Sequence, residues 1–179
     1  LSARGVDVDM DMVLLCREKG FDVAAADAAS FLAALPDDSV GGIFASQIIE
    51  HLAPERVIGL VQLCHRKLSP GGVLVMETPN PTCLTVFADS FYKDPSHIRP
   101  LHPDMMQFLF ETTGFEDVEL RFSAPVSAGA WVPPLDAPAA NREQFNEGLE
   151  RLNRLLYGFQ DYAIIGRAAK PARAQMPAA

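Results

Sequence analysis

Glu50 and His51 are adjacent in the sequence and come shortly after a β-type run, Val40–Ser46. An imidazole placed near a hydroxyl group can take its proton and so act as a general base. Glu50 and His51 are therefore the candidate catalytic residues, with His51 as the leading candidate for the base. The alternative is a structural role for His51, in which its ring bonds the loop that follows.

A proline-rich segment at residues 91–103 combines cationic and aromatic side chains. Its prolines stiffen it, so that it can cover a cleft and present cations to an anionic acceptor such as a phosphosugar. The alternative is a solvated connection whose charges only keep it soluble. The candidate substrate-binding residues in this segment are Tyr92, His97, Arg99 and His102.

Two aspartates stand at the ends of β-type runs. Asp7 lies at the end of Arg4–Val8, and Asp27 follows Phe21–Ala26. Ligands of open parallel sheets bind at the carboxyl edge, where a carboxylate can accept both ribose hydroxyls of a nucleoside. The alternatives are that Asp7 caps the next helix, as is expected of Asp9, and that Asp27 forms a turn.

Six β-type runs alternate with stretches of helical spacing or turn residues, which predicts βα units and a mostly parallel sheet. Helices are expected from Asp9 or Asp11 to Lys19, from Pro54 onward, over Pro103–Thr113 with Gly114 as its stop, and around Phe145–Leu156. We expect one domain over residues 1–167 with an insertion at 123–140, and a disordered tail at 168–179. The runs are Arg4–Val8, Phe21–Ala26, Val40–Ser46, Gly72–Thr78, Val118–Phe122 and Tyr162–Gly166.

Composition narrows the function classes. The 179 residues suffice for one core, and a net charge of −8 disfavours nucleic acid as a partner. Three dispersed cysteines outside any CxxC pattern favour a reducing cytoplasm, and no apolar run reaches the length of a membrane span. A cytoplasmic enzyme with a small-molecule or saccharide acceptor is expected, and the oligomeric state is not readable from the sequence.

Three segments together resemble the pattern of class I S-adenosylmethionine-dependent methyltransferases, and the similarity runs over nearly the whole chain. This resemblance implies a doubly wound, Rossmann-like α/β sheet with one antiparallel strand near the C-terminus. The segments are Gly5-Val6-Asp7-Val8-Asp9, Asp27-Ala28, and Ser46-Gln47-Ile48-Ile49-Glu50-His51-Leu52 followed by Leu68-Ser69-Pro70-Gly71-Gly72.

A closer resemblance is to bacterial methyltransferases found with genes for O-antigen and other surface-polysaccharide assembly. It implies O-methylation of a saccharide or another small acceptor, with S-adenosylmethionine as cosubstrate. The segments that carry it are Glu77-Thr78-Pro79-Asn80-Pro81, Asp94-Pro95-Ser96-His97-Ile98-Arg99-Pro100-Leu101-His102-Pro103 and Gln160-Asp161-Tyr162-Ala163.

The resemblance also implies the cofactor-binding residues. Asp7 and Val8 are expected to bind the ribose hydroxyls. The Asp27 carboxylate and the backbone N–H of Ala28 are expected to bind the adenine. Ser46 and Gln47, at the end of the third run, are expected to face the methionine part.

The sequence departs from the family in one respect. The family's first strand and its GxGxG loop normally precede the Gly-Val-Asp strand by about 20 residues, whereas Leu1 falls just before that strand. We expect the missing strand to leave a gap between the strands of Asp7 and Ser46. Residues 1–179 alone are expected to bind the cofactor weakly or not at all.

Three alternatives remain. Some O-methyltransferases that resemble the chain at Glu-His hold a divalent ion, here by Glu50, His51 and His97 or His102. Gln47 stands where they have another glutamate, so no metal is expected. A non-catalytic scaffold in polysaccharide assembly is the second alternative. The third, an NAD-dependent oxidoreductase, lacks its catalytic Tyr-x-x-x-Lys.

Overall fold

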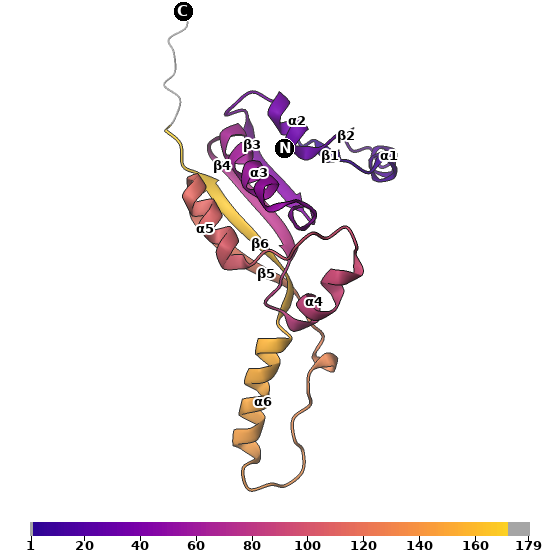
Figure 1. The fold of residues 1–179 in the computed structure, drawn as a ribbon, viewed down its shortest axis with the longest axis vertical. Helices are drawn as coiled ribbons and strands as arrows, with labels where there is room; N and C mark the ends of the chain where they lie inside the picture. The colour runs from indigo at the N-terminus through magenta and orange to yellow at the C-terminus, as the bar shows by residue number, and fades with distance from the viewer. Residues whose placement is uncertain (1, 172–179) are drawn as a thin grey trace, which may run out of the picture.

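The strands form two separate sheets in the computed structural model, which describes residues 2–171 (Figure 1). A parallel pair joins β1 (Gly5–Asp7) to β2 (Val23–Ala25). The larger sheet has the order β3-β4-β6-β5, with β3 parallel to β4 and β6 antiparallel to both of its neighbours. Its strands are β3 (Val40–Ser46), β4 (Leu68–Pro79), β5 (Phe115–Pro125) and β6 (Phe159–Ala168).

Each of the six predicted runs overlaps a strand, which confirms the α/β class. The two sheets share no hydrogen-bonded ladder in the part of the chain that the structure describes. No strand of residues 2–171 pairs with both β1 and β3, the strands that carry Asp7 and Ser46, between which the sequence predicts a gap.

Two helices cover one face of the four-stranded sheet, the face toward the viewer in Figure 1. They are α3 (Pro54–Lys67) and α5 (Pro103–Thr113), and both begin with proline in the first turn, as predicted. Gly114 ends α5 in the left-handed conformation, with φ 105°. Each large apolar side chain buried between helix and sheet stabilises the fold by about 1.5–3 kcal/mol. The core includes Val57, Leu60, Val61, Cys64, Leu74, Met76, Met106, Phe110, Tyr162 and Ile164.

The opposite face of this sheet is more open. Phe44 on β3 leaves 69% of its surface exposed, and its partner Val75 on β4 is half-buried, whereas Ala45 and Met76 in the next row are buried. Burial therefore alternates along these strands, as expected for a sheet packed on one side. A doubly wound sheet has helices packed on both faces. Within residues 2–171, helices cover this sheet on one face only.

The first two helices begin at aspartates. Asp9 caps α1 (Met10–Glu18) by accepting hydrogen bonds from the backbone N–H groups of Asp11 and Met12, at 2.8 and 3.3 Å. Asp27 caps α2 (Ala28–Ala34) in the same way. The expected capping role of Asp9 is confirmed.

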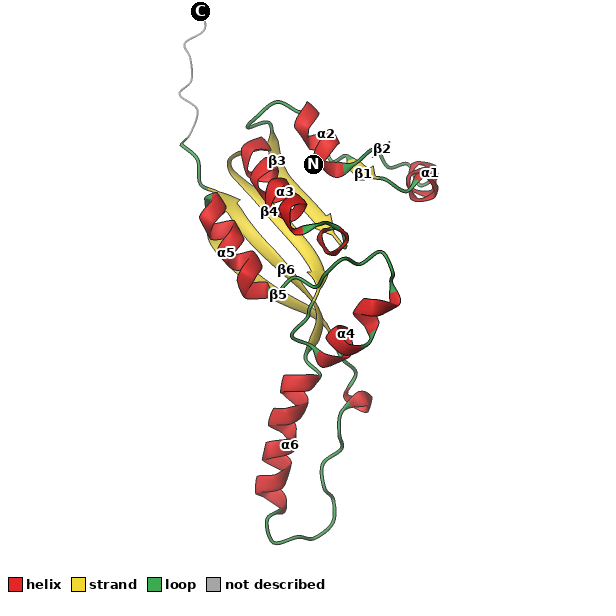
Figure 2. Ribbon diagram, in the orientation of Figure 1, coloured by secondary structure: helices red, strands yellow, loops and turns green. Residues whose placement is uncertain are grey.

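The segment between β5 and β6 extends away from the sheet, at the bottom of Figure 2, and ends in α6 (Arg142–Leu156). Asn153 exchanges two hydrogen bonds with the backbone of Val132, at 2.9 and 3.0 Å, and Asn146 does the same with Leu135. Two asparagines on α6 thus hold the extended insertion. Because β5 continues to Pro125, the first residues of the predicted 123–140 insertion belong to the sheet.

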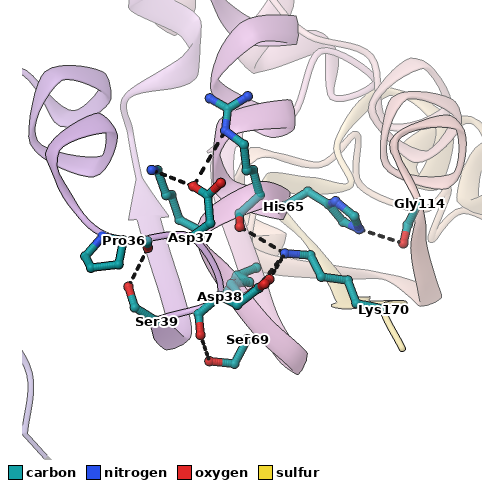
Figure 3. Close-up of polar contacts among 11 residues, drawn as sticks. Pro36, Asp37, Asp38, Ser39, His65, Ser69, Gly114 and Lys170 are labelled. Carbon is teal, nitrogen blue, oxygen red and sulfur yellow. Dashed lines mark hydrogen bonds and ion pairs between the residues drawn. The ribbon is translucent and has the colours of Figure 1, made fainter. Parts of the chain in front are cut away.

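The C-terminal end of β6 is fastened at the edge opposite the candidate site (Figure 3). Lys170 Nζ donates to Asp38 Oδ1 at 2.6 Å and to the carbonyls of Arg66 and Leu68 at 3.0 and 2.8 Å. Ala168 still belongs to β6. Residues 168–171 of the predicted tail are thus part of the described chain, and residues 172–179 lie outside the described residues. No helix within residues 2–171 is long and apolar enough to span a bilayer.

Candidate active site

The carboxyl ends of β3 and β4 form the edge at which the candidate residues gather. Ser46 Oγ donates to Glu77 Oε1 at 2.9 Å, and Gln47 N donates to the Glu77 carbonyl at 2.9 Å. Gln47 adopts φ 54°, a left-handed conformation that is uncommon for a residue with a side chain. Such strained residues cluster at functional sites, where the chain must turn sharply.

Gln47 also reaches β6, since its Nε2 donates to Asp161 Oδ1 at 3.3 Å. Burial raises the pKa of Asp161. The hydrogen bond from Gln47 opposes this, and the neighbouring Glu77 charge adds the smallest effect, which also raises the pKa. Asp161 and His97 both line a cavity of about 170 Å³, together with Pro79, Val86, Ser90, Phe91 and Gln160. A small ligand could thus meet polar groups from β6 and from the proline-rich segment.

Glu50 lies in the short helical turn η1 (Ile49–His51) and is fully buried. Its Oε2 accepts a hydrogen bond from Thr78 Oγ1 at 2.9 Å, whereas Oε1 has no hydrogen-bond partner among the described residues. Burial raises the pKa of this carboxyl group, against smaller opposing effects of hydrogen bonds and of the two nearby histidines. A buried carboxylate oxygen without a partner is costly, so its retention calls for a functional explanation.

His51 is held in one tautomer by a chain of hydrogen bonds. Ser96 Oγ lies 2.9 Å from His51 Nδ1 and 2.5 Å from Asp94 Oδ1. A hydroxyl has one proton, and an ionised carboxylate can only accept, so Ser96 donates to Asp94 and accepts from His51 Nδ1–H. The neutral ring then carries its lone pair on Nε2, which lies 3.9 Å from Glu50 Oε1. The structural role and the catalytic role considered for His51 are thus compatible.

His97 is brought against this pair. Its ring centroid lies 4.7 Å from that of His51, and the backbone N–H of Ile98 donates to the Glu50 carbonyl at 2.8 Å. His97 Nδ1 lies 2.6 Å from the carbonyl oxygen of Phe91, which can only accept, so Nδ1 carries the proton. Potential ligand atoms of Glu50, His51 and His97 all lie within 4.8 Å of one another.

The other residues proposed for substrate contact are placed differently. Tyr92 and Arg99 are exposed, and the Tyr92 ring packs edge-on against Phe91. His102 Nδ1 accepts from the backbone N–H of Asp104 at 3.2 Å and so caps α5. His102 therefore has a structural role at the helix start, which its position before Pro103 could have indicated.

The residues expected to hold adenosine lie at the ends of β1 and β2. Asp7 Oδ1 accepts from the backbone N–H of Asp9 at 2.8 Å, and the next residue, Val8, is exposed. Asp27 accepts from Ser30 N at 3.0 Å and pairs with Arg56 at 3.0 Å. The bond from the Ser30 backbone is the largest of the effects that lower the Asp27 pKa.

In this arrangement Asp27 combines the capping contact with an ion pair, and Ala28 begins α2 directly after it. The ion pair is with α3, a partner that sequence reasoning missed because the two residues meet only in the tertiary fold. Thr78 and Ser96 were missed for the same reason, although both lie inside segments that carry the family resemblance.

Comparisons with known proteins agree with this architecture. A methyltransferase domain model matches residues 1–76. An S-adenosylmethionine-dependent methyltransferase from Archaeoglobus fulgidus is 38% identical, with a TM-score of 0.85, over 93% of this chain and 76% of that one. The chain belongs to the S-adenosylmethionine-dependent methyltransferases. This membership favours methyl transfer over the hydride transfer considered from the sequence.

Two further relatives of this methyltransferase differ in sequence identity and in the share of each chain that is matched. A protein of Mycolicibacterium smegmatis, named a probable S-adenosylmethionine-dependent methyltransferase, is 37% identical over 103 residues, which are 58% of this chain. The match spans only 38% of that protein's length. Phosphoethanolamine N-methyltransferase 2 of Haemonchus contortus, solved with S-adenosylmethionine, is 15% identical with a TM-score of 0.61, over 93% of this chain and 43% of that one, and shares the fold.

Proposed function

We propose that the chain transfers a methyl group from S-adenosylmethionine to an oxygen atom of a saccharide or other small-molecule acceptor. The observation that carries the proposal is the fixed tautomer of His51, whose Nε2 lone pair lies at the carboxyl edge of the sheet. Its side chain is 31% exposed, so an acceptor can reach it. Family membership supports the donor, and the imidazole supports an acceptor that must lose a proton.

The proposed reaction is an in-line displacement. The acceptor oxygen attacks the methyl carbon, the carbon–sulfur bond breaks, and the sulfonium becomes a neutral thioether. The hydroxyl proton passes to His51 Nε2. Glu50 Oε1, 3.9 Å away, then faces the positive charge that forms on the ring.

For the cofactor we propose that Asp7 and Val8 hold the ribose, that Asp27 and Ala28 hold the adenine, and that Ser46 and Gln47 face the methionine part. A strand between β1 and β3 would place its carboxyl end between Asp7 and Ser46. The break between the two sheets supports this. The pair of Asp27 with Arg56 implies that one Asp27 oxygen must exchange its partner on cofactor binding.

For the acceptor we propose the cavity beside His97, with Tyr92 and Arg99 contributing from the exposed part of the same segment. The cation Arg99 suits a phosphorylated or otherwise anionic saccharide, as does the resemblance to methyltransferases of polysaccharide assembly. His102 would shape this wall through its cap on α5 rather than by direct contact.

The test measures methyl transfer from labelled S-adenosylmethionine to a panel of saccharides, sugar phosphates and nucleotide sugars. We expect labelled product with at least one hydroxyl acceptor, and for His51→Gln a loss in kcat of about 10²–10⁴-fold. The matched control, His65→Gln, changes a histidine in the last turn of α3, where it bonds the Gly114 carbonyl. Calorimetric titration with S-adenosylhomocysteine runs in parallel. Binding without transfer would favour the non-catalytic scaffold, and the absence of both would refute the proposal.

A further inference from the structure

Glu50, His51 and His97 each bring a possible ligand atom to the candidate site, and these atoms all lie within 4.8 Å of one another. Glu50 Oε1 has no hydrogen-bond partner in residues 2–171. His51 and His97 each have their Nδ1 proton committed, to Ser96 and to the Phe91 carbonyl, which leaves both Nε2 lone pairs. Acceptor atoms this close together repel unless a cation lies between them, so this arrangement favours a bound cation.

The cluster is held from several sides. Thr78 fixes the second oxygen of Glu50, and the bond from Ile98 N to the Glu50 carbonyl fastens the proline-rich segment to η1. Glu50 is fully buried and the His97 side chain is only 12% exposed. Metal-binding histidines characteristically donate their other ring N–H to a carbonyl or carboxylate. His97 does so directly, and His51 does so through a serine.

We propose that Glu50, His51 and His97 form a binding site for a divalent transition-metal ion. Two imidazoles and one carboxylate suit Zn²⁺, Co²⁺ or Fe²⁺ better than Mg²⁺, which prefers oxygen ligands. A tetrahedral Zn²⁺ site with bonds of about 2.1 Å has its ligand atoms about 3.4 Å apart. The present separations of up to 4.8 Å therefore need side-chain shifts of about an ångström.

This inference revises the sequence-based expectation that no metal takes part. That expectation rested on Gln47, which replaces a further glutamate. In the fold, the Gln47 side chain bonds Asp161 instead. Three ligands from Glu50, His51 and His97 would leave at least one position of a tetrahedral ion open, as in catalytic zinc sites.

The site goes beyond the proposed function and changes one of its steps. An ion on His51 Nε2 would prevent that nitrogen from accepting the proton of the acceptor. The ion would itself hold the acceptor oxygen and lower the pKa of its hydroxyl group, so that the proton would leave to water. Metal binding is measurable without S-adenosylmethionine, so the two proposals can fail separately.

The experiment titrates the metal-free chain, prepared by chelation and desalting, with Co²⁺ and follows the visible absorption of the bound ion. We expect saturable binding at a ratio of one ion per chain, reversed by Zn²⁺. Glu50→Gln and His97→Ala should each weaken binding by about 100-fold or more, and Ser96→Ala by about 10-fold through the orientation of His51. Circular dichroism checks that each variant is folded.

The matched control is His102→Asn, which removes an imidazole from the same segment and keeps a side chain that can cap α5. It should bind Co²⁺ as the unsubstituted chain does. No saturable binding, or an equal loss in His102→Asn, would overturn the site. Ser96→Ala and His97→Ala act from the loop, so the test does not depend on Glu50→Gln alone.

Discussion

The unpartnered oxygen of Glu50 predicts that this residue destabilises the fold at neutral pH. Glu50→Gln replaces Oε1 or its equivalent by an amide that can donate toward His51 Nε2, 3.9 Å away, and keeps an acceptor for Thr78. Relief of an unsatisfied buried group is worth about 1–3 kcal/mol, and exchange of a charged for a neutral acceptor at Thr78 loses about 1 kcal/mol. The expected net stabilisation is about 1 kcal/mol.

The effect should depend on pH with a defined sign. Burial raises the pKa of Glu50 above its unfolded value of about 4.3. The folded chain therefore holds this proton more tightly than the unfolded chain, so the Glu50 contribution is most favourable below about pH 4. It falls as pH rises through the folded pKa. The advantage of Glu50→Gln should accordingly be present at pH 7.5 and close to zero at pH 4.

Urea unfolding in the presence of a chelator, followed by circular dichroism, measures the change in unfolding free energy at pH 7.5 and at pH 4. With a slope of about 2–3 kcal/mol/M, a gain of about 1 kcal/mol moves the midpoint upward by about 0.4 M. The control is Glu116→Gln on exposed β5, for which we expect a change within about 0.5 kcal/mol at either pH. A Glu50→Gln variant that is destabilised at pH 7.5, or stabilised equally at both pH values, would refute this reasoning.

Other substitutions test the packing. Gly166→Ala would place a Cβ 2.9 Å from Phe110 and should lower the unfolding free energy by about 1–3 kcal/mol in urea. Gly148→Ala in α6, where nothing lies within 4 Å, should raise it by up to about 1 kcal/mol, and the opposite order would contradict this account. Asn153→Ala removes both bonds to Val132, so limited proteolysis should cut the insertion sooner, and unchanged rates would show that these bonds do not hold it.

Much of the fold was predictable because it depends on local signals. The helix Pro103–Thr113 has the predicted bounds, since proline at its first position and Gly114 after its end act within the segment itself. The strand over Val40–Ser46 was likewise predicted to the residue. β6 extends to Ala168, where the sequence predicts the start of a tail, and Lys170 bonds Asp38 and the Leu68 carbonyl, contacts that no local pattern reveals.

The candidate site was likewise predictable only in part. The sequence by itself indicated Glu50, His51 and His97 as residues able to do chemistry, and a family resemblance indicated the cofactor. Only the tertiary structure buries Glu50, fixes the tautomer of His51 through a serine 45 residues away, and separates His97 from His102. The physical reason is that residue type sets what a side chain can donate or accept. Which donor it meets depends on strand order and on the path of the loop.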